Sequence, residues 1–176
     1  MQHTLEILIS KEEIDARINI LAAEINEHYK DSKSILLVGL LRGSAIFLAD
    51  LARQLTGPVA LDFMATSSYG SGTTTKGEVR ILKEFDEQIH GRDVIIVEDI
   101  IDTGNTLNKI REMLLLRDPK SLAICTLLNK TSRHQVDVKI DWQGFSVENK
   151  FVVGYGIDFN QLYRNLPYIA SVNFNS

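Results

Sequence analysis

Two neighbouring carboxylates and a short polar segment follow an apolar run near the middle of the chain. Residues 94–97 are all Val or Ile, Glu98 and Asp99 come next, and residues 103–106 read Thr-Gly-Asn-Thr. Open α/β sheets bind ligands at the carboxyl ends of their strands, so a strand over 94–97 would deliver both carboxylates to that edge. A turn that opens a helix adds free backbone amides, hydroxyl groups and the positive helix end. The segment therefore predicts a site for a phosphate monoester.

The carboxylates limit what that ligand can be. Glu98 and Asp99 would repel a phosphate unless they face ribose hydroxyls, a proton that moves during the reaction, or a metal ion. The pairing therefore favours a phosphorylated sugar. A purely structural interpretation also stands, in which Asp102 and Thr103 cap the following helix and the acidic pair is a solvated strand end. Residue types and spacing leave both interpretations open.

Alternating strand-like and helix-like segments must position these groups. Residues 10–13 read Ser-Lys-Glu-Glu, a capping-box pattern, and apolar residues follow at helical spacing. Apolar runs bounded by turn residues predict buried strands over 34–40, 59–65, 94–97 and 122–128, and helical patterns predict helices over 44–55 and 106–116. This order predicts a single α/β domain over residues 1–176, with three layers and a mainly parallel central sheet.

Composition and charge argue against several classes of function. The chain carries 23 acidic and 19 basic residues, a formal net charge of −4, so its surface does not favour nucleic acid as the main partner. Its one cysteine, Cys125, lies in an apolar run, and the N-terminus has no signal-like segment. We therefore expect a reducing cytoplasm and no membrane partner. The four histidines lack ligand spacing, which gives no support to a zinc site.

Residues 67–77 are rich in Gly, Ser and Thr and lie between two strand-like runs. Composition alone favours an exposed hairpin connection over a lid that closes on an active site. The glycines of this segment would nevertheless give a lid backbone freedom at both of its ends. Both interpretations stay open on composition.

The run over residues 94–106 resembles the signature of the type I phosphoribosyltransferases. Four further segments, 40–43, 67–70, 127–130 and 151–158, fall in the order and spacing of that family, and nearly the whole chain resembles the bacterial type of hypoxanthine-guanine phosphoribosyltransferase. The resemblance implies the type I fold, with a small hood region built from the chain ends. It implies a purine salvage enzyme that moves the 5-phosphoribosyl group of phosphoribosyl pyrophosphate to N9 of hypoxanthine or guanine, giving IMP or GMP and pyrophosphate. It also implies Mg²⁺ as cofactor and a homo-oligomer, either a dimer or a tetramer.

The resemblance also implies roles for individual residues. The ribose and 5′-phosphate would be bound by Glu98, Asp99, Asp102, Thr103, Gly104, Asn105 and Thr106. Asp102 would in addition be the catalytic acid or base at N7 of the purine. Pyrophosphate would be bound by Arg42, Gly43 and Arg164, beside a 41–42 peptide that can be cis in this family, and the purine by Lys130, Phe151, Val152 and Asp158. The lid would contribute Ser68 and Tyr69, and the metal would be held by Glu98, Asp99 and Asp158.

Four of these residues also have an ordinary structural interpretation. Lys130 would donate to the 6-oxo oxygen of the base, but as a lysine after a strand it could simply be solvated. Phe151 would stack on the base, although its spacing fits a core residue. Arg164 could make a surface ion pair, and Asp158 could belong to a plain turn.

Two other functions compete with this interpretation. A regulator that keeps the fold as a ligand sensor and binds RNA or DNA would need a basic face or an added recognition helix, which this acidic chain does not offer. A phosphoribosyltransferase for another base is the second rival. Pyrophosphate release with uracil or adenine, but not with hypoxanthine, would identify it.

Overall fold

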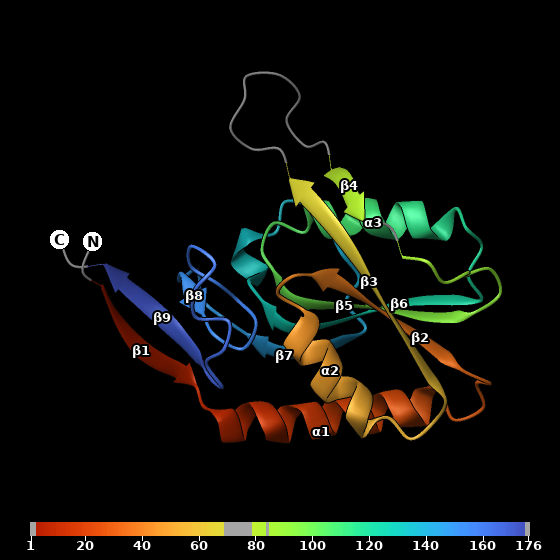
Figure 1. Ribbon diagram of the computed structural model, residues 1–176, viewed down its shortest axis with the longest axis horizontal. Coiled ribbons are helices and arrows are strands. Elements are labelled where there is room, and N and C mark those ends of the chain that lie inside the picture. Colours follow the sequence, from red (N-terminus) through yellow and green to blue (C-terminus); the bar gives the residue numbers. More distant parts are fainter. Residues whose placement is uncertain (1–2, 69–78, 84, 175–176) are drawn as a thin grey trace.

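The computed structural model describes residues 3–68, 79–83 and 85–174, and Figure 1 draws them as a ribbon coloured along the chain. The elements follow in the order β1 (His3–Ile9), α1 (Lys11–His28), β2 (Ile35–Leu41), α2 (Ala45–Gln54), β3 (Val59–Ser68), β4 (Val79–Lys83), β5 (Asp93–Ile101), α3 (Asn105–Leu115), β6 (Ser121–Asn129), the short 3₁₀ helix η1 (Thr131–Arg133), β7 (Trp142–Ser146), β8 (Val152–Val153) and β9 (Ile169–Phe174). Helices therefore alternate with strands through the middle of the chain, as the sequence predicts.

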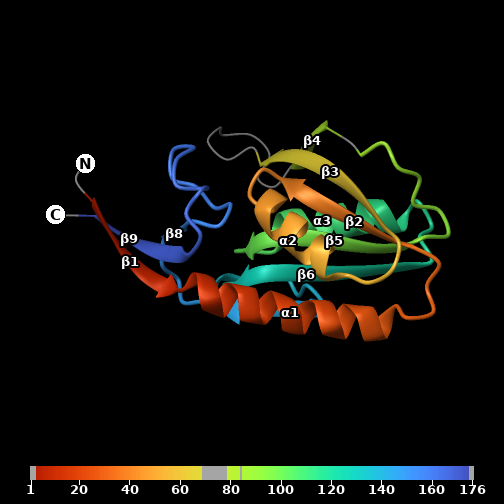
Figure 2. The ribbon, with the colours of Figure 1, turned by 60° about the horizontal axis from the view of Figure 1, so that its bottom comes forward.

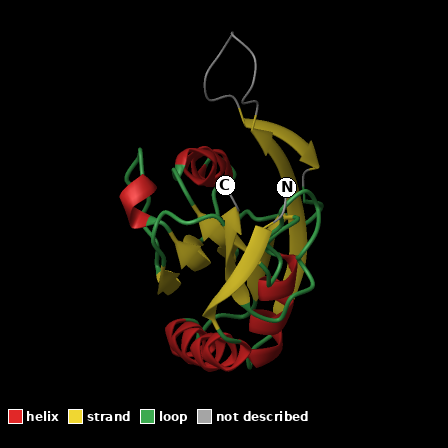
Figure 3. Ribbon diagram, turned by 90° about the vertical axis from the view of Figure 1, so that its left-hand side faces the viewer, coloured by secondary structure: helices red, strands yellow, loops and turns green. Residues whose placement is uncertain are grey.

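The central sheet has six strands in the order β4-β3-β2-β5-β6-β7. All neighbouring strands in it are parallel except β3 and β4. Helices α1 and α2 pack on one face of this sheet and α3 on the other, and Figure 3 shows the strands lying between the two helical layers. The predicted three-layer α/β fold with a mainly parallel central sheet is confirmed.

Alternate side chains of the central strands enter two separate cores. In β2, Ile35 and Leu37 pack with α1 and α2, whereas Leu36 and Val38 pack with α3. Because both faces are covered, these strands carry continuous apolar runs, which is why their pattern is visible in the sequence. Cys125 of β6 is fully buried in the first of these cores, as predicted.

Helix α1 begins at the predicted capping box. The backbone N–H of Glu13 donates to Oγ of Ser10 at 3.2 Å, and the N–H of Ser10 donates to Oε2 of Glu13 at 2.7 Å. The apolar residues Ile14, Ile18, Leu21 and Ile25 are all buried. No helix in the described ranges is long and apolar enough to cross a membrane.

A second sheet joins the two ends of the chain. Strands β1, β9 and β8 pair in that order, antiparallel throughout, with Leu5 opposite Val172 and Val152 opposite Ser171. Figures 1 and 2 place this sheet at the end of the molecule where both termini lie, beyond the start of α1. It corresponds to the expected hood region from the chain ends. The sequence pattern does not predict the three strands themselves: β1 is half exposed and β8 has two residues, whereas β9 is largely buried and was missed.

Two strands extend by three or more residues beyond their predicted ends. β5 continues to Ile101 because it keeps pairing with β6 up to Asn129, so Glu98 and Asp99 lie inside the strand rather than beyond its end. β3 continues to Ser68 because its last residues pair with the antiparallel strand β4, which the pattern did not reveal. The segment predicted as a loop from residue 67 therefore starts within a strand.

Candidate active site

The turn between β5 and α3 begins the candidate site. Gly104 is the N-cap of α3 and has a φ of +79°, a left-handed conformation that favours glycine. A Cβ atom there would lie 2.9 Å from Cγ2 of Val138, so the turn has little room for a side chain. Gly104 has no side chain to cap the helix, but Oγ1 of Thr103 accepts from the N–H of Asn105 at 3.4 Å. The N-cap is therefore neither Asp102 nor Thr103, although Thr103 does contact the first turn of α3.

A small hollow of about 170 Å³ opens over this turn. It is lined by Glu98, Ile100, Ile101, Asp102, Thr103, Gly104, Thr106 and Leu107. Two hydrogen bonds with Gln135 hold the turn in place. The N–H of Gln135 donates to the Thr103 carbonyl at 3.0 Å, and Nδ2 of Asn105 donates to Oε1 of Gln135 at 2.7 Å. Amides in the first turn of a helix have no intrahelical partner, so this hollow suits a phosphate group.

The acidic pair sits in a sheltered position at the floor of this region. Oε2 of Glu98 is buried and has no hydrogen-bond partner among the described residues. Burial, with a smaller contribution from the charge of Asp99, raises the pKa of Glu98 well above its usual range. Burial likewise raises the pKa of Asp99 to about 6, although its own N–H and that of Ile100 act in the opposite direction. A solvated strand end does not describe this pair.

Three distant segments meet at Asp99. A Cβ atom on Gly43, in the loop after β2, would fall 1.7 Å from Oδ2 of Asp99. A Cβ atom on Gly156, in the C-terminal loop, would fall 2.0 Å from the carbonyl oxygen of Gly43. The absence of side chains at both glycines thus allows β5, the β2–α2 loop and the C-terminal loop to pack against one another. The peptide bond between Leu41 and Arg42 is cis.

The two predicted pyrophosphate arginines are linked through a residue that sequence reasoning missed. Oε1 of Gln161 accepts from Nη1 of Arg42 at 2.9 Å and from Nη2 of Arg164 at 3.1 Å. Arg164 also forms an ion pair with Asp158 at 2.7 Å, and the N–H of Gln161 donates to Oδ2 of Asp158 at 2.8 Å. Asp158 therefore takes the turn position that the sequence left open as an alternative, and it contacts Arg164 as well. The three-residue spacing from Asp158 was the one sequence signal for Gln161.

The exposure of Lys130 and Phe151 does not fit the ordinary structural interpretation of either residue, a solvated lysine and a core phenylalanine. Lys130 follows β6, is only 9% exposed, and its N–H donates to the carbonyl of Ile101 at 2.9 Å, so it is not a freely solvated lysine. Phe151 is 47% exposed, so it is not a core residue. Its ring makes edge contacts with Phe159 and Phe174 of the hood at 5.5 and 6.1 Å between centroids. Val152 is buried in β8.

Asp102 has an ion-pair partner that the sequence did not suggest. Its Oδ1 accepts from Nε of Arg133 at 2.9 Å, and both side chains are about half exposed, at 46% and 44%. Arg133 ends the short helix η1, which starts directly after Lys130. Of the predicted lid, Ser68 ends β3, whereas Tyr69 lies outside the described residues.

The described residues contain no group of three or more His, Cys, Asp or Glu side chains arranged to hold a metal ion. Mg²⁺, however, is commonly held by only one or two carboxylates together with substrate phosphates. The buried, unpartnered oxygen of Glu98 beside Asp99 offers oxygen donors of that kind. The residues present therefore fit Mg²⁺ that arrives with a phosphorylated substrate.

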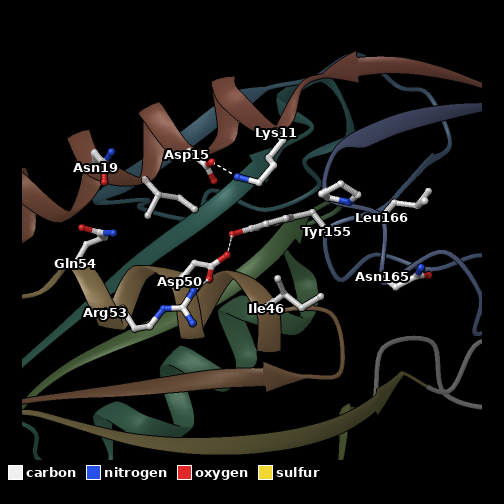
Figure 4. Close-up of a pocket in the computed structure, with 12 residues that line it drawn as sticks. Lys11, Asp15, Asn19, Ile46, Asp50, Arg53, Gln54, Tyr155, Asn165 and Leu166 are labelled. Atoms are coloured by element: carbon white, nitrogen blue, oxygen red, sulfur yellow. Dashed lines mark hydrogen bonds and ion pairs between the residues drawn. The ribbon is translucent and has the colours of Figure 1, made fainter.

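A larger hollow of about 590 Å³ lies between α1, α2 and residues 165–167, and Figure 4 shows its lining side chains. None of the predicted site residues lines it. Size alone would point to this hollow, but the acidic pair, the arginines and the α3 turn lie elsewhere. We therefore place the candidate site at the β5–α3 turn.

Comparison with known proteins identifies the family. The chain matches the phosphoribosyl transferase domain family over residues 6–160. It is 60% identical to hypoxanthine phosphoribosyltransferase of Salmonella typhimurium, covering 98% of this chain and 97% of that protein. It is 46% identical to hypoxanthine-guanine phosphoribosyltransferase of Bacillus subtilis, covering 97% and 94%.

A solved structure supports the same assignment. The crystal structure of a hypoxanthine-guanine phosphoribosyltransferase from Bacillus anthracis superposes with a TM-score of 0.91 at 40% identity, covering 98% of this chain and all of that one. Fold and sequence thus agree on the family. The chain belongs to the phosphoribosyltransferase family, among the hypoxanthine-guanine phosphoribosyltransferases.

Proposed function

We propose that this chain transfers the 5-phosphoribosyl group of phosphoribosyl pyrophosphate to N9 of hypoxanthine or guanine, giving IMP or GMP and releasing pyrophosphate. The relatives that carry this activity in their names align with nearly their whole length. The single structural observation that carries the proposal is the partly buried acidic pair, with a buried Oε2 of Glu98, beside the hollow at the start of α3. Such a pair suits the ribose of a phosphorylated sugar.

The β5–α3 turn would hold the sugar phosphate. First-turn amides of α3 and the hydroxyls of Thr103 and Thr106 would surround the 5′-phosphate, and Glu98 and Asp99 would bind the ribose hydroxyls. These contacts need not change during the reaction, so they anchor the substrate rather than lower the barrier. Gly104 and Asn105 complete this loop.

The leaving pyrophosphate would lie against the second half of the site. Arg42, Gly43 and Arg164 would contact it, with Gln161 holding the two arginines together in the free protein. Enzymes of this family generally depend on Mg²⁺, and we propose Glu98, Asp99 and Asp158 as the residues that would hold it. When bound, the ion would offset charge on the departing pyrophosphate.

The base would enter between Lys130 and Phe151. The Lys130 ammonium would donate to the 6-oxo oxygen, Phe151 would stack on the ring, and the backbone of Val152 would read the base edge. As the N9–C1′ bond forms and the C1′–oxygen bond to pyrophosphate breaks, the purine must lose a proton. Asp102 would accept it at N7, after exchanging its contact with Arg133 for one with the base.

Three further expectations remain part of the proposal. Ser68 and Tyr69 would belong to a lid that excludes water from the reacting sugar. The protein would act in the cytoplasm as a single-domain subunit of a dimer or tetramer, without nucleic-acid or membrane partners. Its other partners would be its substrates and products.

A steady-state comparison of hypoxanthine, guanine, xanthine and adenine, each with phosphoribosyl pyrophosphate and Mg²⁺, tests the proposal. We expect pyrophosphate release with the 6-oxopurines and little with adenine. Turnover with adenine alone, or with uracil tested as a fifth base, would replace this function by that of a phosphoribosyltransferase for another base.

A further inference from the structure

A tyrosine of the C-terminal loop is tied to helix α2. Tyr155 is 5% exposed and packs in the core together with α1 and α2. Its hydroxyl donates a hydrogen bond to Oδ2 of Asp50, and Figure 4 shows the phenol reaching from the loop to that helix. Burial raises the pKa of Tyr155, and the hydrogen bond to Asp50 raises it further. The phenol therefore stays protonated and remains a donor.

The conformation of Tyr155 needs such support. Its φ is +48°, which is uncommon for a residue with a large side chain. The ring is fixed by burial, the hydroxyl by Asp50, and the backbone N–H donates to the carbonyl of Leu166 at 2.8 Å. These contacts together hold the loop in a shape that an unanchored tyrosine would tend to leave.

Gly156, the next residue in the chain, contacts two residues of the candidate site, Arg164 and Gly43. The N–H of Gly156 donates to the carbonyl of Arg164 at 2.9 Å, and Nη1 of Arg164 donates back to the Gly156 carbonyl at 2.7 Å. Gly156 also packs so closely on Gly43 that even a Cβ atom would not fit. A shift of Tyr155 would therefore displace Gly156 relative to Gly43 and Arg164, two of the three groups assigned to pyrophosphate.

Asp50, the partner of Tyr155 in this hydrogen bond, lies on the helix that follows the Gly43 loop. Asp50 belongs to α2, which starts at Ala45, directly after the loop that contains Gly43. Oδ1 of Asp50 is paired with Arg53. The hydrogen bond thus connects the C-terminal loop to the helix that continues from the other pyrophosphate loop.

The neighbouring hollow does not explain this contact as a ligand site. Tyr155 and Asp50 form part of the wall of the hollow of about 590 Å³ in Figure 4. Among its lining residues the charged groups are already paired, Lys11 with Asp15 and Arg53 with Asp50. The contact is better explained by the position that it gives to Gly156.

We infer that Tyr155 and Asp50 are positioning residues for the pyrophosphate half of the site: their hydrogen bond sets where Gly156 lies, and through it the relative positions of Arg164 and Gly43. The inference rests on the proposed function, because it takes the pyrophosphate contacts from there. It adds two residues that touch no substrate.

Tyr155→Phe tests the inference, since it removes the hydroxyl and keeps the ring in the core. We expect KM for phosphoribosyl pyrophosphate to rise by about 10-fold, because a small displacement of Gly43 and Arg164 weakens their contacts to pyrophosphate. The Kd of IMP, which carries no pyrophosphate, should change by less than about 2-fold, because its phosphate and ribose contacts lie at the β5–α3 turn. The melting temperature is measured for the same protein.

Asp50 provides the matched pair of variants. Asp50→Ala should reproduce the rise in KM, whereas Asp50→Asn keeps an oxygen that can accept from Tyr155 and should restore most of the parent value. Because both substitutions also break the pair with Arg53, Arg53→Gln serves as a control and should leave KM unchanged. Tyr155→Phe combined with Asp50→Ala should be no worse than either change alone.

Separate results distinguish the inference from the function on which it rests. Absence of turnover with any 6-oxopurine in the parent protein would reject the proposed function. If the parent is active, an unchanged KM in Tyr155→Phe would overturn the inference, even where the melting temperature falls. An equal loss of IMP and phosphoribosyl pyrophosphate affinity would also overturn it, because it would indicate a general structural role.

Discussion

The two halves of the candidate site are built in opposite ways. The sugar-phosphate half comes from one uninterrupted segment, from Glu98 in β5 to Thr106 in α3. The pyrophosphate half brings together residues such as Arg42 and Gln161, which are 119 positions apart in the chain. The first half is a strand, a turn and a helix in sequence, whereas the second exists only after the chain has folded.

This difference predicts how each half responds to substitution. The first half depends on the chemical type of its side chains, carboxylates and hydroxyls around a helix start. The second depends on backbone conformation, because Tyr155, Asn160, Gln161 and Tyr163 all have positive φ, and Gly156 packs directly on Gly43. Isosteric changes should therefore be severe in the first half, and small changes in shape should be severe in the second.

The largest effect is expected where the side chain takes part in the chemistry. Asp102→Asn keeps an oxygen that can accept from Arg133 but cannot take up a proton. We expect kcat to fall by roughly 10²- to 10⁴-fold with little change in KM for phosphoribosyl pyrophosphate. Steady-state kinetics with hypoxanthine measures this. Turnover within a few-fold of the parent would show that Asp102 is a structural residue. It would contradict the argument that the first half of the site depends on side-chain chemistry.

Lys130 extends the same test to recognition of the base. Its ammonium group only donates, so it should favour a base with an acceptor at C6, and discrimination against adenine can reach about 10⁴ when a buried polar partner is left unpaired. Lys130→Met keeps a side chain of similar length without the charge, and should lower the preference for hypoxanthine by roughly 10²-fold or more. The ratio of kcat/KM values for the two bases reports the change. A parent that uses both bases equally would refute this role.

Gly156→Ala tests the half that depends on shape. The new methyl group would lie 2.0 Å from the carbonyl of Gly43, so one of the two loops must move. We expect kcat/KM for phosphoribosyl pyrophosphate to fall by about 10²-fold, as displacements of about 1 Å commonly do.

Gly91→Ala is the matched control. Gly91 also has a positive φ, +68°, but no atom lies within 4 Å of the added Cβ. It should lower stability by about 1 kcal/mol through backbone strain and leave the kinetics unchanged. Equal kinetic losses in both variants would contradict the argument from close packing.

The smallest effect is expected at the opposite end of β5, away from the candidate site. Burial by itself raises the pKa of Asp93, but hydrogen bonds from Lys120, Ser32 and Ser121 outweigh it and hold the pKa below its ordinary value. A carboxyl group whose pKa is lowered by folding stabilises the fold above its unfolded pKa, about 3.9, and that stabilisation is lost as the pH falls through the folded value.

Asp93→Asn should therefore lower the free energy of unfolding by about 1–3 kcal/mol at pH 7, and by less as the pH falls below about 4. Urea unfolding at several pH values measures both quantities. Asp118→Asn, at a side chain that is 84% exposed, is the control and should change little. A difference that does not vary with pH would show that Asp93 acts through shape and not charge.

The sequence by itself determined the helices, the parallel strands β2, β3, β5 and β6, and the local half of the site. Runs such as residues 35–41 are apolar at every position because both faces of the sheet are covered, and the capping box at Ser10 marks the start of α1. The acidic pair and the turn after it are adjacent in the chain, so their chemistry was predictable before their geometry was known. The hood was expected from the resemblance alone, since β1 is half exposed and β8 has only two residues.

Only the tertiary structure decided the rest. That β5 extends to Ile101 depends on pairing with β6, and a strand's partner is not encoded in its own apolar pattern. Several hydrogen bonds of the site join residues that are distant in the chain: Gln161 with Arg42, Arg133 with Asp102, and Tyr155 with Asp50. Gln161 also accepts from Arg164. Such contacts arise where loops cross over a folded sheet, and neither periodicity nor residue type carries information about which loops will meet.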